Sequence, residues 1–241
     1  ILRYKGKPVI PIIIITLCLT VYFICIFISS RWYVQNLKIK YLSSDIIAST
    51  KVLEQEQKEI INKEEYNPKD NNKYSDVSFI SVNFDDLIAK NNETVGWIKV
   101  NNTNDNEYYL KHDFNKNYNI YGWVFADYRD DFEYFGNNTI VYAHNMTDRS
   151  MFGSLVWCLR KSWYTNNENQ FIKISTPKSN TVWKIFSIYT IKPEVYYLKT
   201  YFESPEEHQI FLDVLKGRSI HNFNEDVTPN DKILTLSTCS D

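Results

Sequence analysis

The apolar positions of this chain change period along its length, from one continuous run to a helical spacing and then to the spacing of strands. From Pro8 to Ser30 no residue is charged, and this length matches the roughly 20 apolar residues that cross a bilayer as a helix. We expect a retained transmembrane helix. A cleaved signal peptide is the alternative, but the run exceeds the apolar core of about 7 to 15 residues typical of signals, and Ser29–Trp32 is a poor cleavage site.

The next segment, from Tyr33 to Glu65, repeats apolar residues among many charges and contains no glycine or proline. This pattern is typical of an amphipathic helix, which we expect to form a stalk with one break near Ser43–Asp45. Asn67–Asn72 reads as a linker. We therefore divide the chain into a cytoplasmic tip and membrane anchor (1–32), a helical stalk and linker (33–75) and a globular domain (76–241).

Within the globular domain, short runs rich in β-branched and aromatic residues predict a mainly β architecture with helices in the connections. We expect strands at 95–100, 120–126, 139–144, 171–175, 181–191 and 232–239, the fifth long enough to bend around a barrel. We also expect a short helix capped by Asn83, a helix beginning at Ser150, and a helix from the Ser204–Glu207 capping box to Gly217.

Charge adds an orientation to this picture. The formal net charge is -2, but Arg3, Lys5, Lys7 and Arg31 contribute +4, so the remainder carries -6 and has no footprint for nucleic acid. The basic residues before the apolar run favour a cytoplasmic N-terminus and an external domain, although Arg31 weakens that bias. Histidines and cysteines are too scattered for a zinc site, and no glycine-rich phosphate loop occurs, so we expect no cofactor.

The candidate chemistry lies in the last apolar run, Lys232–Cys239, which is expected to hold a cysteine at a strand end. A free thiol has a pKa of about 8.5, so a nucleophilic Cys239 needs a partner. Of the four histidines only His144 also ends a strand-like run, and two strand ends can bring the pair together. The alternatives are a buried packing cysteine and a disulfide with Cys158.

Three segments, in this order and separation, carry a resemblance to a known family: Asn138–Met146, Ser150–Gly153 and Thr235–Cys239. They resemble the class B sortases from about Val77 to the end of the chain. That resemblance implies a sortase-like β-barrel with peripheral helices, a Gram-positive cell membrane, and cysteine transpeptidase activity. Cys239 would attack a threonine carbonyl in the C-terminal sorting motif of a secreted protein, and His144 would move the protons. The acceptor would be the amine of a peptidoglycan precursor or of a protein.

The chain departs from the family pattern in two places. The family's catalytic arginine follows the cysteine strand, whereas this sequence stops at Asp241 and its other arginines do not match that position. A further strand expected between Val100 and Tyr108 is missing, which affects one wall of the substrate groove. We therefore expect a fragment of a longer gene product with feeble activity, and the alternatives are a surface cysteine hydrolase and a membrane-tethered binding domain.

The 204–217 helix is a class B feature. His112, His208 and His221 are expected to be surface or loop residues, and Asp241 either orients His144 or is solvated.

Overall fold

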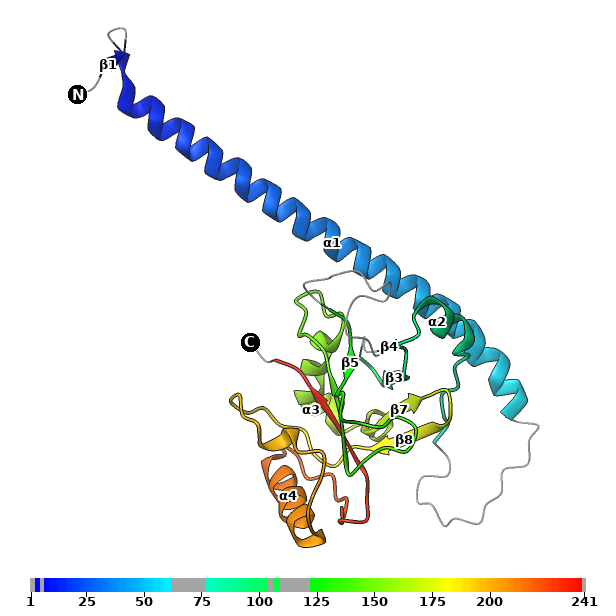
Figure 1. Cartoon of the computed structure of the whole chain (residues 1–241). Coiled ribbons are helices and arrows are strands. Elements are labelled where there is room, and N and C mark those ends of the chain that lie inside the picture. The colour runs from blue at the N-terminus through cyan, green and yellow to red at the C-terminus, as the bar shows by residue number, and fades with distance from the viewer. Residues whose placement is uncertain (1–2, 5–6, 62–76, 104–105, 109–121, 240–241) are drawn as a thin grey trace. The chain divides into compact units, whose positions relative to one another are not determined.

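The computed structural model of the protein describes residues 3–4, 7–61, 77–103, 106–108 and 122–239. The chain divides into two compact units, Ile1–Asp45 and Ile46–Asp241, and each is described by itself (Figure 1). The predicted linker at Asn67–Asn72 lies outside the described residues, as do His112 and Asp241. The proposed division of the chain into anchor, stalk and globular domain stays a prediction.

The first unit begins with two short paired strands, β1 (Arg3–Tyr4) and β2 (Lys7–Pro8), which lead into the long helix α1 (Val9–Ile61). The part from Val9 to Ile46 is long and apolar enough to be a candidate membrane span. Two of its threonine hydroxyls bond within the helix: Thr16 donates to the Ile12 carbonyl at 2.8 Å and Thr20 to the Leu17 carbonyl at 2.7 Å. Such internal pairing is what a hydrocarbon environment requires. The predicted break near Ser43 is wrong, because α1 continues through it.

The second unit contains two separate sheets (Figure 1). The first is antiparallel and has the order β4 (Asn106–Tyr108), β3 (Trp97–Val100), β7 (Phe171–Ser175) and β8 (Asn180–Lys184). The second has the order β5 (Phe125–Ala126), β6 (Asn138–Tyr142) and β9 (Ile233–Ser237). β5 is antiparallel to β6, whereas β9 is parallel to it. A β-rich fold is thus present, but these pairings do not show a closed barrel.

Helical segments occupy the connections. The α-helices are α2 (Asp85–Lys90), α3 (Lys161–Tyr164) and α4 (Pro205–Arg218), and the 3-10 helices are η1 (Phe152–Leu159), η2 (Asn167–Gln170) and η3 (Tyr196–Leu198). The start of α4 is confirmed: the Ser204 hydroxyl accepts a hydrogen bond from the Glu207 amide at 3.2 Å. The Glu207 carboxylate turns back to the Glu203 amide at 2.8 Å instead of to the cap residue itself.

Several strand predictions were too long, and those at 120–126 and 181–191 were the furthest from the structure. β8 ends at Lys184, and β5 comprises only Phe125–Ala126. Beyond β8 the backbone bonds to the α4 region instead of to a strand, since the Ile188 amide donates to the Ser219 hydroxyl at 3.1 Å and its carbonyl accepts from Ile220 at 2.8 Å. These tertiary contacts override the strand propensity of the segment. The helix expected from Ser150 is the 3-10 helix η1, which begins at Phe152.

The core explains how α4 is connected to the second sheet. Phe202, Phe211, Leu212 and Leu215 form a buried cluster with Ile233, the first residue of β9. α4 therefore packs against the beginning of the cysteine strand. In Figure 1 this helix (orange) lies beside the connection that leads into the red strand.

A tight turn follows β6 and returns the chain into η1. The Phe152 amide donates to the His144 carbonyl at 3.1 Å, and Arg149 Nη1 donates to the Gly153 carbonyl at 3.1 Å. Gly153 itself faces the backbone of Met146: a Cβ atom there would lie 2.3 Å from the Met146 carbonyl oxygen and 2.9 Å from its nitrogen. The turn therefore requires a residue without a side chain at 153.

We predict that Gly153→Ala destabilises the protein by about 2 to 3 kcal/mol, because the added methyl overlaps backbone atoms that cannot rotate away. Urea unfolding of the full chain in detergent would measure this. Gly217→Ala is the matched control, since a Cβ in that part of α4 meets no atom within 4 Å. It should stabilise the protein by about 0.5 to 1 kcal/mol. Equal stability of both variants would contradict the crowded turn.

A partly buried carboxylate, Asp130, ties the loop between β5 and β6 to the sheet. Its Oδ2 accepts a hydrogen bond from the Ile140 amide at 2.6 Å. Burial raises the pKa of Asp130 to about 6 from its ordinary value of 3.8, although that hydrogen bond acts in the opposite direction. Between about pH 4 and pH 6 the folded state therefore binds more protons at this site than the unfolded state.

It follows that the contribution of Asp130 to stability is lost as the pH rises from about 4 to 6. Asp130→Asn keeps an oxygen acceptor for the Ile140 amide and does not ionise. The stability of this variant relative to the wild type should therefore improve steadily across that interval, as measured by urea unfolding at a series of pH values. Asp131→Asn, an exposed neighbour in the same loop, is the control. A constant difference between Asp130→Asn and wild type would show that burial does not raise this pKa.

Candidate active site

Cys239 lies at the end of the second sheet. Ile233 anchors β9 in the core, the strand ends at Ser237, and Cys239 follows two residues later as an exposed free thiol. The alternative of a buried packing cysteine is therefore wrong. The disulfide alternative is also wrong, because Cys239 is free while Cys158 is buried within η1 at 7% exposure.

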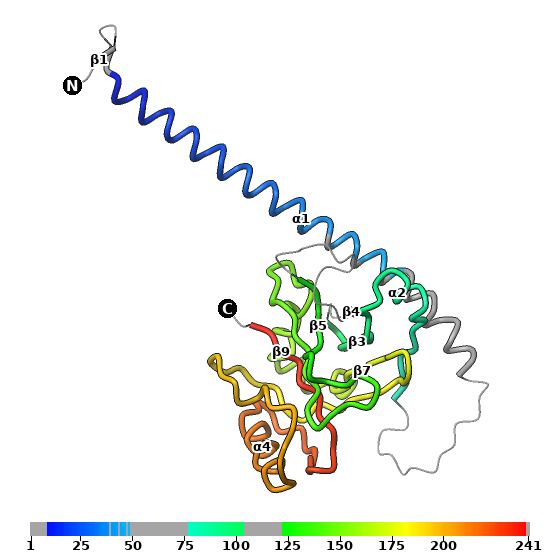
Figure 2. The backbone as a smooth tube through the Cα atoms, in the orientation of Figure 1, coloured from blue at the N-terminus to red at the C-terminus, as the bar shows by residue number. Residues whose placement is uncertain are grey.

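His144 occupies the equivalent place on the neighbouring strand. β6 ends at Tyr142, and Tyr142 pairs in parallel register with Ser237. The ladder extends one step further, because the Ala143 amide donates to the Ser237 carbonyl at 3.3 Å. Cys239 and His144 are thus each two residues beyond the same rung, and both are exposed. Parallel strands end at the same edge of a sheet, so the register brings a thiol and an imidazole to one edge; Figure 2 shows β9 in red beside the green strands.

The remaining described histidines lie on other elements. His208 was expected at the surface, but it is only 2% exposed, because its ring stacks on Phe202 with the centroids 4.2 Å apart. Its burial lowers the pKa of the imidazole. His221 is partly buried and stacks on Tyr164 at 4.8 Å. Neither belongs to the strand edge that carries Cys239.

Sequence reasoning missed a set of polar side chains just before that edge. Tyr142 donates to Asp127 Oδ2 at 2.9 Å, and Arg129 binds both oxygens of the same carboxylate, at 2.8 and 2.7 Å. The Arg129 hydrogen bond is the main reason that the pKa of Asp127 falls to about 2. Burial, followed by the Asp127 hydrogen bond, raises the pKa of Tyr142. The only signal in the sequence was the acidic and aromatic composition of 127–138.

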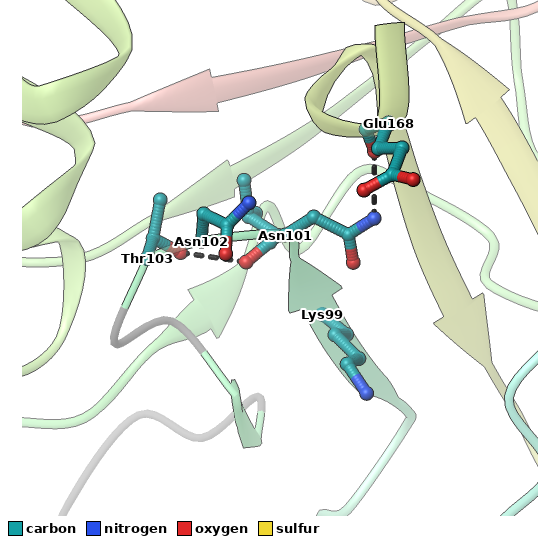
Figure 3. A pocket seen from close by; sticks show the side chains of 6 residues that line it. Lys99, Asn101, Asn102, Thr103 and Glu168 are labelled. Atoms are coloured by element: carbon teal, nitrogen blue, oxygen red, sulfur yellow. Dashed lines mark hydrogen bonds between the residues drawn. The ribbon is translucent and has the colours of Figure 1, made fainter. Parts of the chain in front are cut away.

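Within the parts of the chain that the structure describes, no three His, Cys, Asp or Glu side chains gather to hold an ion. A polar hollow of about 280 Å³ lies instead at the end of β3, between residues 99–103 and Glu168 (Figure 3). Its groups bond to one another: Asn101 Nδ2 donates to the Glu168 carbonyl at 2.7 Å, and the Thr103 hydroxyl to the Val100 carbonyl at 2.8 Å. The hollow includes neither Cys239 nor His144.

The segment after Val100 is the one that departs from the pattern of the resemblance. In this interval the structure places the short strand β4, which begins at Asn106 and pairs with β3. Residues 104–105 and 109–121 lie outside the described part of the chain. The effect of this shortening on the groove wall therefore stays a prediction.

Comparison with individual known proteins places the chain in a family, although no family model matches it. It is 33% identical to sortase B of Staphylococcus aureus over 167 residues, which cover 66% of this chain and 68% of that protein. It is 32% identical to sortase B of Listeria monocytogenes over 163 residues, which cover 64% and 65% of the two chains.

Solved structures agree with these relatives. A Bacillus anthracis protein described as similar to sortase B has a TM-score of 0.60 and 33% identity, covering 65% of this chain and 77% of that one. A Staphylococcus aureus sortase B–substrate complex has a TM-score of 0.61 and 30% identity, covering 80% and 88% of the two chains. The second unit therefore has a sortase-like fold, and the chain belongs to the class B sortases, a family of cysteine transpeptidases.

Proposed function

We propose that this protein is a transpeptidase that cleaves a C-terminal sorting motif of secreted proteins and joins the threonine carbonyl to an amine. The acceptor amine belongs to a cell-wall precursor or to another protein. The observation that carries this proposal is the shared strand edge, where Cys239 and His144 follow the paired rung of Tyr142 and Ser237. One of the related structures is a sortase B–substrate complex, which supports substrate binding by this fold.

In the first half of the reaction, Cys239 Sγ attacks the threonine carbonyl carbon. The peptide C–N bond breaks, His144 gives a proton to the departing amine, and a thioester joins the threonine to the enzyme. Both side chains must be accessible for this step, and both are exposed. The free thiol at a strand end provides a nucleophile held by a rigid element.

In the second half, the acceptor amine attacks the thioester carbonyl and loses a proton to His144. The C–S bond breaks, Cys239 is released as a thiolate, and a new amide bond forms. Imidazole suits both proton transfers because its ordinary pKa is close to neutrality. Attack by water in place of the amine would yield a free acid, so the choice of acceptor separates a transpeptidase from a hydrolase.

The candidate span in α1 supports a location at the cell membrane. We propose that α1 anchors the protein, with the N-terminus in the cytoplasm and the domain outside, where secreted substrates and cell-wall precursors are found. The basic residues before the span favour this orientation. The proposal also agrees with the apolar side chains of the span, which are exposed to their surroundings.

We predict that the full-length protein releases the downstream half of a quenched peptide containing Asn-Pro-x-Thr, and that triglycine becomes joined to the threonine. Cys239→Ala should reduce turnover by at least about 10³-fold, because it removes the nucleophile. His144→Ala should reduce it by about 10² to 10⁴-fold, the usual contribution of a general acid–base group. Fluorescence and mass spectrometry of the products would measure both effects.

Cys18→Ala and His221→Ala are the matched controls and should keep wild-type turnover. Undiminished cleavage by Cys239→Ala would defeat the proposal. Free acid as the sole product, even with abundant triglycine, would identify a hydrolase. Binding of the peptide without cleavage would favour a membrane-tethered binding domain.

We also predict that a membrane-impermeant maleimide added to intact cells labels Cys239. Cys18 and Cys25 lie in the candidate span and Cys158 is buried, so Cys239 is the thiol that the reagent can reach. The label should disappear in Cys239→Ala. Labelling that appears only after the membrane is permeabilised would place the domain inside the cell.

A further inference from the structure

Two hydroxyl groups connect η3 with the cysteine strand. The Tyr197 hydroxyl in η3 lies 2.9 Å from the Ser237 hydroxyl at the end of β9. Ser237 is the last residue of β9 and precedes Cys239 by two residues. The hydrogen bond therefore connects η3 to the end of β9 that leads to the thiol.

The histidine strand is connected to the same 3-10 helix through charged groups. Tyr142, two residues before His144, donates to Asp127, whose side chain is only 7% exposed. Arg129 binds that carboxylate through Nε and Nη2, and its Nη2 also donates to the Leu198 carbonyl at 3.0 Å. A charge-assisted bond with two parallel contacts fixes geometry better than a single neutral bond does. Tyr142 is thus linked through Asp127 and Arg129 to Leu198, the residue that follows Tyr197.

These contacts close into a ring, because Tyr142 and Ser237 are themselves register partners across the sheet. We call it the strand-end ring; its members are Asp127, Arg129, Tyr142, Tyr197, Leu198 and Ser237. Asn138, at the start of β6, makes three further hydrogen bonds that connect the same elements. Asn138 Nδ2 donates to the carbonyls of Tyr197 at 3.1 Å and Lys199 at 2.9 Å, while Asn138 Oδ1 accepts from the Thr235 hydroxyl at 2.7 Å.

The position of the strand-end ring favours a positioning role over a purely stabilising one. The ring joins the rung of Tyr142 and Ser237 to η3, which lies about 40 residues before the end of β9 in the sequence. One neutral hydrogen bond contributes about 1 kcal/mol to stability, so its loss leaves the domain folded. A misplacement of reacting groups by about 1 Å, in contrast, can cost about 10²-fold in rate.

We propose that the strand-end ring is a positioning device that holds Cys239 and His144 at their reactive separation, with Tyr197 as a positioning residue. This inference rests on the proposed function, since it concerns the transfer catalysed by that pair. It also means that η3 and the strand edge move together: displacement of η3 is transmitted to β9 through Tyr197 and to β6 through Arg129.

The test is Tyr197→Phe in the full-length protein. This substitution removes one hydroxyl and keeps the aromatic side chain. We expect kcat to fall by about 10- to 100-fold, KM to stay within about twofold, and the urea midpoint to change little. Tyr134→Phe, at an exposed tyrosine, is the matched control and should leave all three values unchanged. A Tyr197→Phe protein with wild-type kcat would overturn the proposal while leaving the proposed function intact.

A double-mutant cycle tests whether the ring acts as a unit. Arg129→Gln should lower kcat too, and the Arg129→Gln/Tyr197→Phe protein should lose less than the product of the two single losses, because either change already opens the ring. Independent effects that multiply would contradict a closed ring.

A readout independent of turnover separates failure of the ring from failure of the proposed function. Iodoacetamide alkylation of Cys239, followed by peptide mass spectrometry across pH, reports how closely an imidazolium assists the thiolate. In Tyr197→Phe the pH of half-maximal alkylation should rise relative to wild type. If the wild type transfers no peptide, the proposed function fails, and the alkylation profile still decides the ring. An unchanged profile would refute it.

Discussion

The parallel pairing of β6 with β9 is the constraint on which the candidate site depends. Parallel strands cannot be joined by a tight turn and need a long crossover. Here the bonded pair Asn138 and Thr235 is 97 residues apart, and β7, β8 and α4 all lie in the crossover. The pairing is therefore costly in chain entropy and has to be stabilised by contacts along its whole length. In return, it brings two chemically different strand ends to the same edge in fixed register.

Each end of β9 is stabilised in a different way. At its beginning, Ile233 is buried in the apolar cluster with α4, where the driving force is the removal of side chains from water. At its end, Ser237 is held by a directional hydrogen bond to Tyr197. Apolar packing tolerates small shifts, whereas hydrogen bonds and ion pairs specify angle and distance. The directional contacts lie at the end that leads to Cys239.

The sequence predicted those features that depend on local patterns. β7 and α4 were found nearly residue by residue, because a short β-branched run and a proline-containing capping box are local signals. Cys239 and His144 were paired because both end apolar runs, but their common rung depends on a register set by long-range contacts. The same limitation explains the errors at 185–191 and His208: both segments bond or stack with residues distant in sequence, so tertiary contacts overrode their local appearance.

The loop between β5 and β6 shows how one segment separates two electrostatic roles. Asp127 is held ionised by Arg129, with its pKa near 2, whereas burial raises the pKa of Asp130, three residues later, to about 6. Mild acid therefore protonates Asp130, whose acceptor oxygen serves the Ile140 amide, while the Asp127–Arg129 pair stays charged. The orientation of Arg129 toward Leu198 is accordingly insensitive to pH in the range where Asp130 titrates. The link between β6 and η3 thus depends on Asp127, which stays ionised, and not on Asp130. Protonation of Asp130 can therefore change without breaking the contacts that Asp127 and Arg129 make with Tyr142 and Leu198.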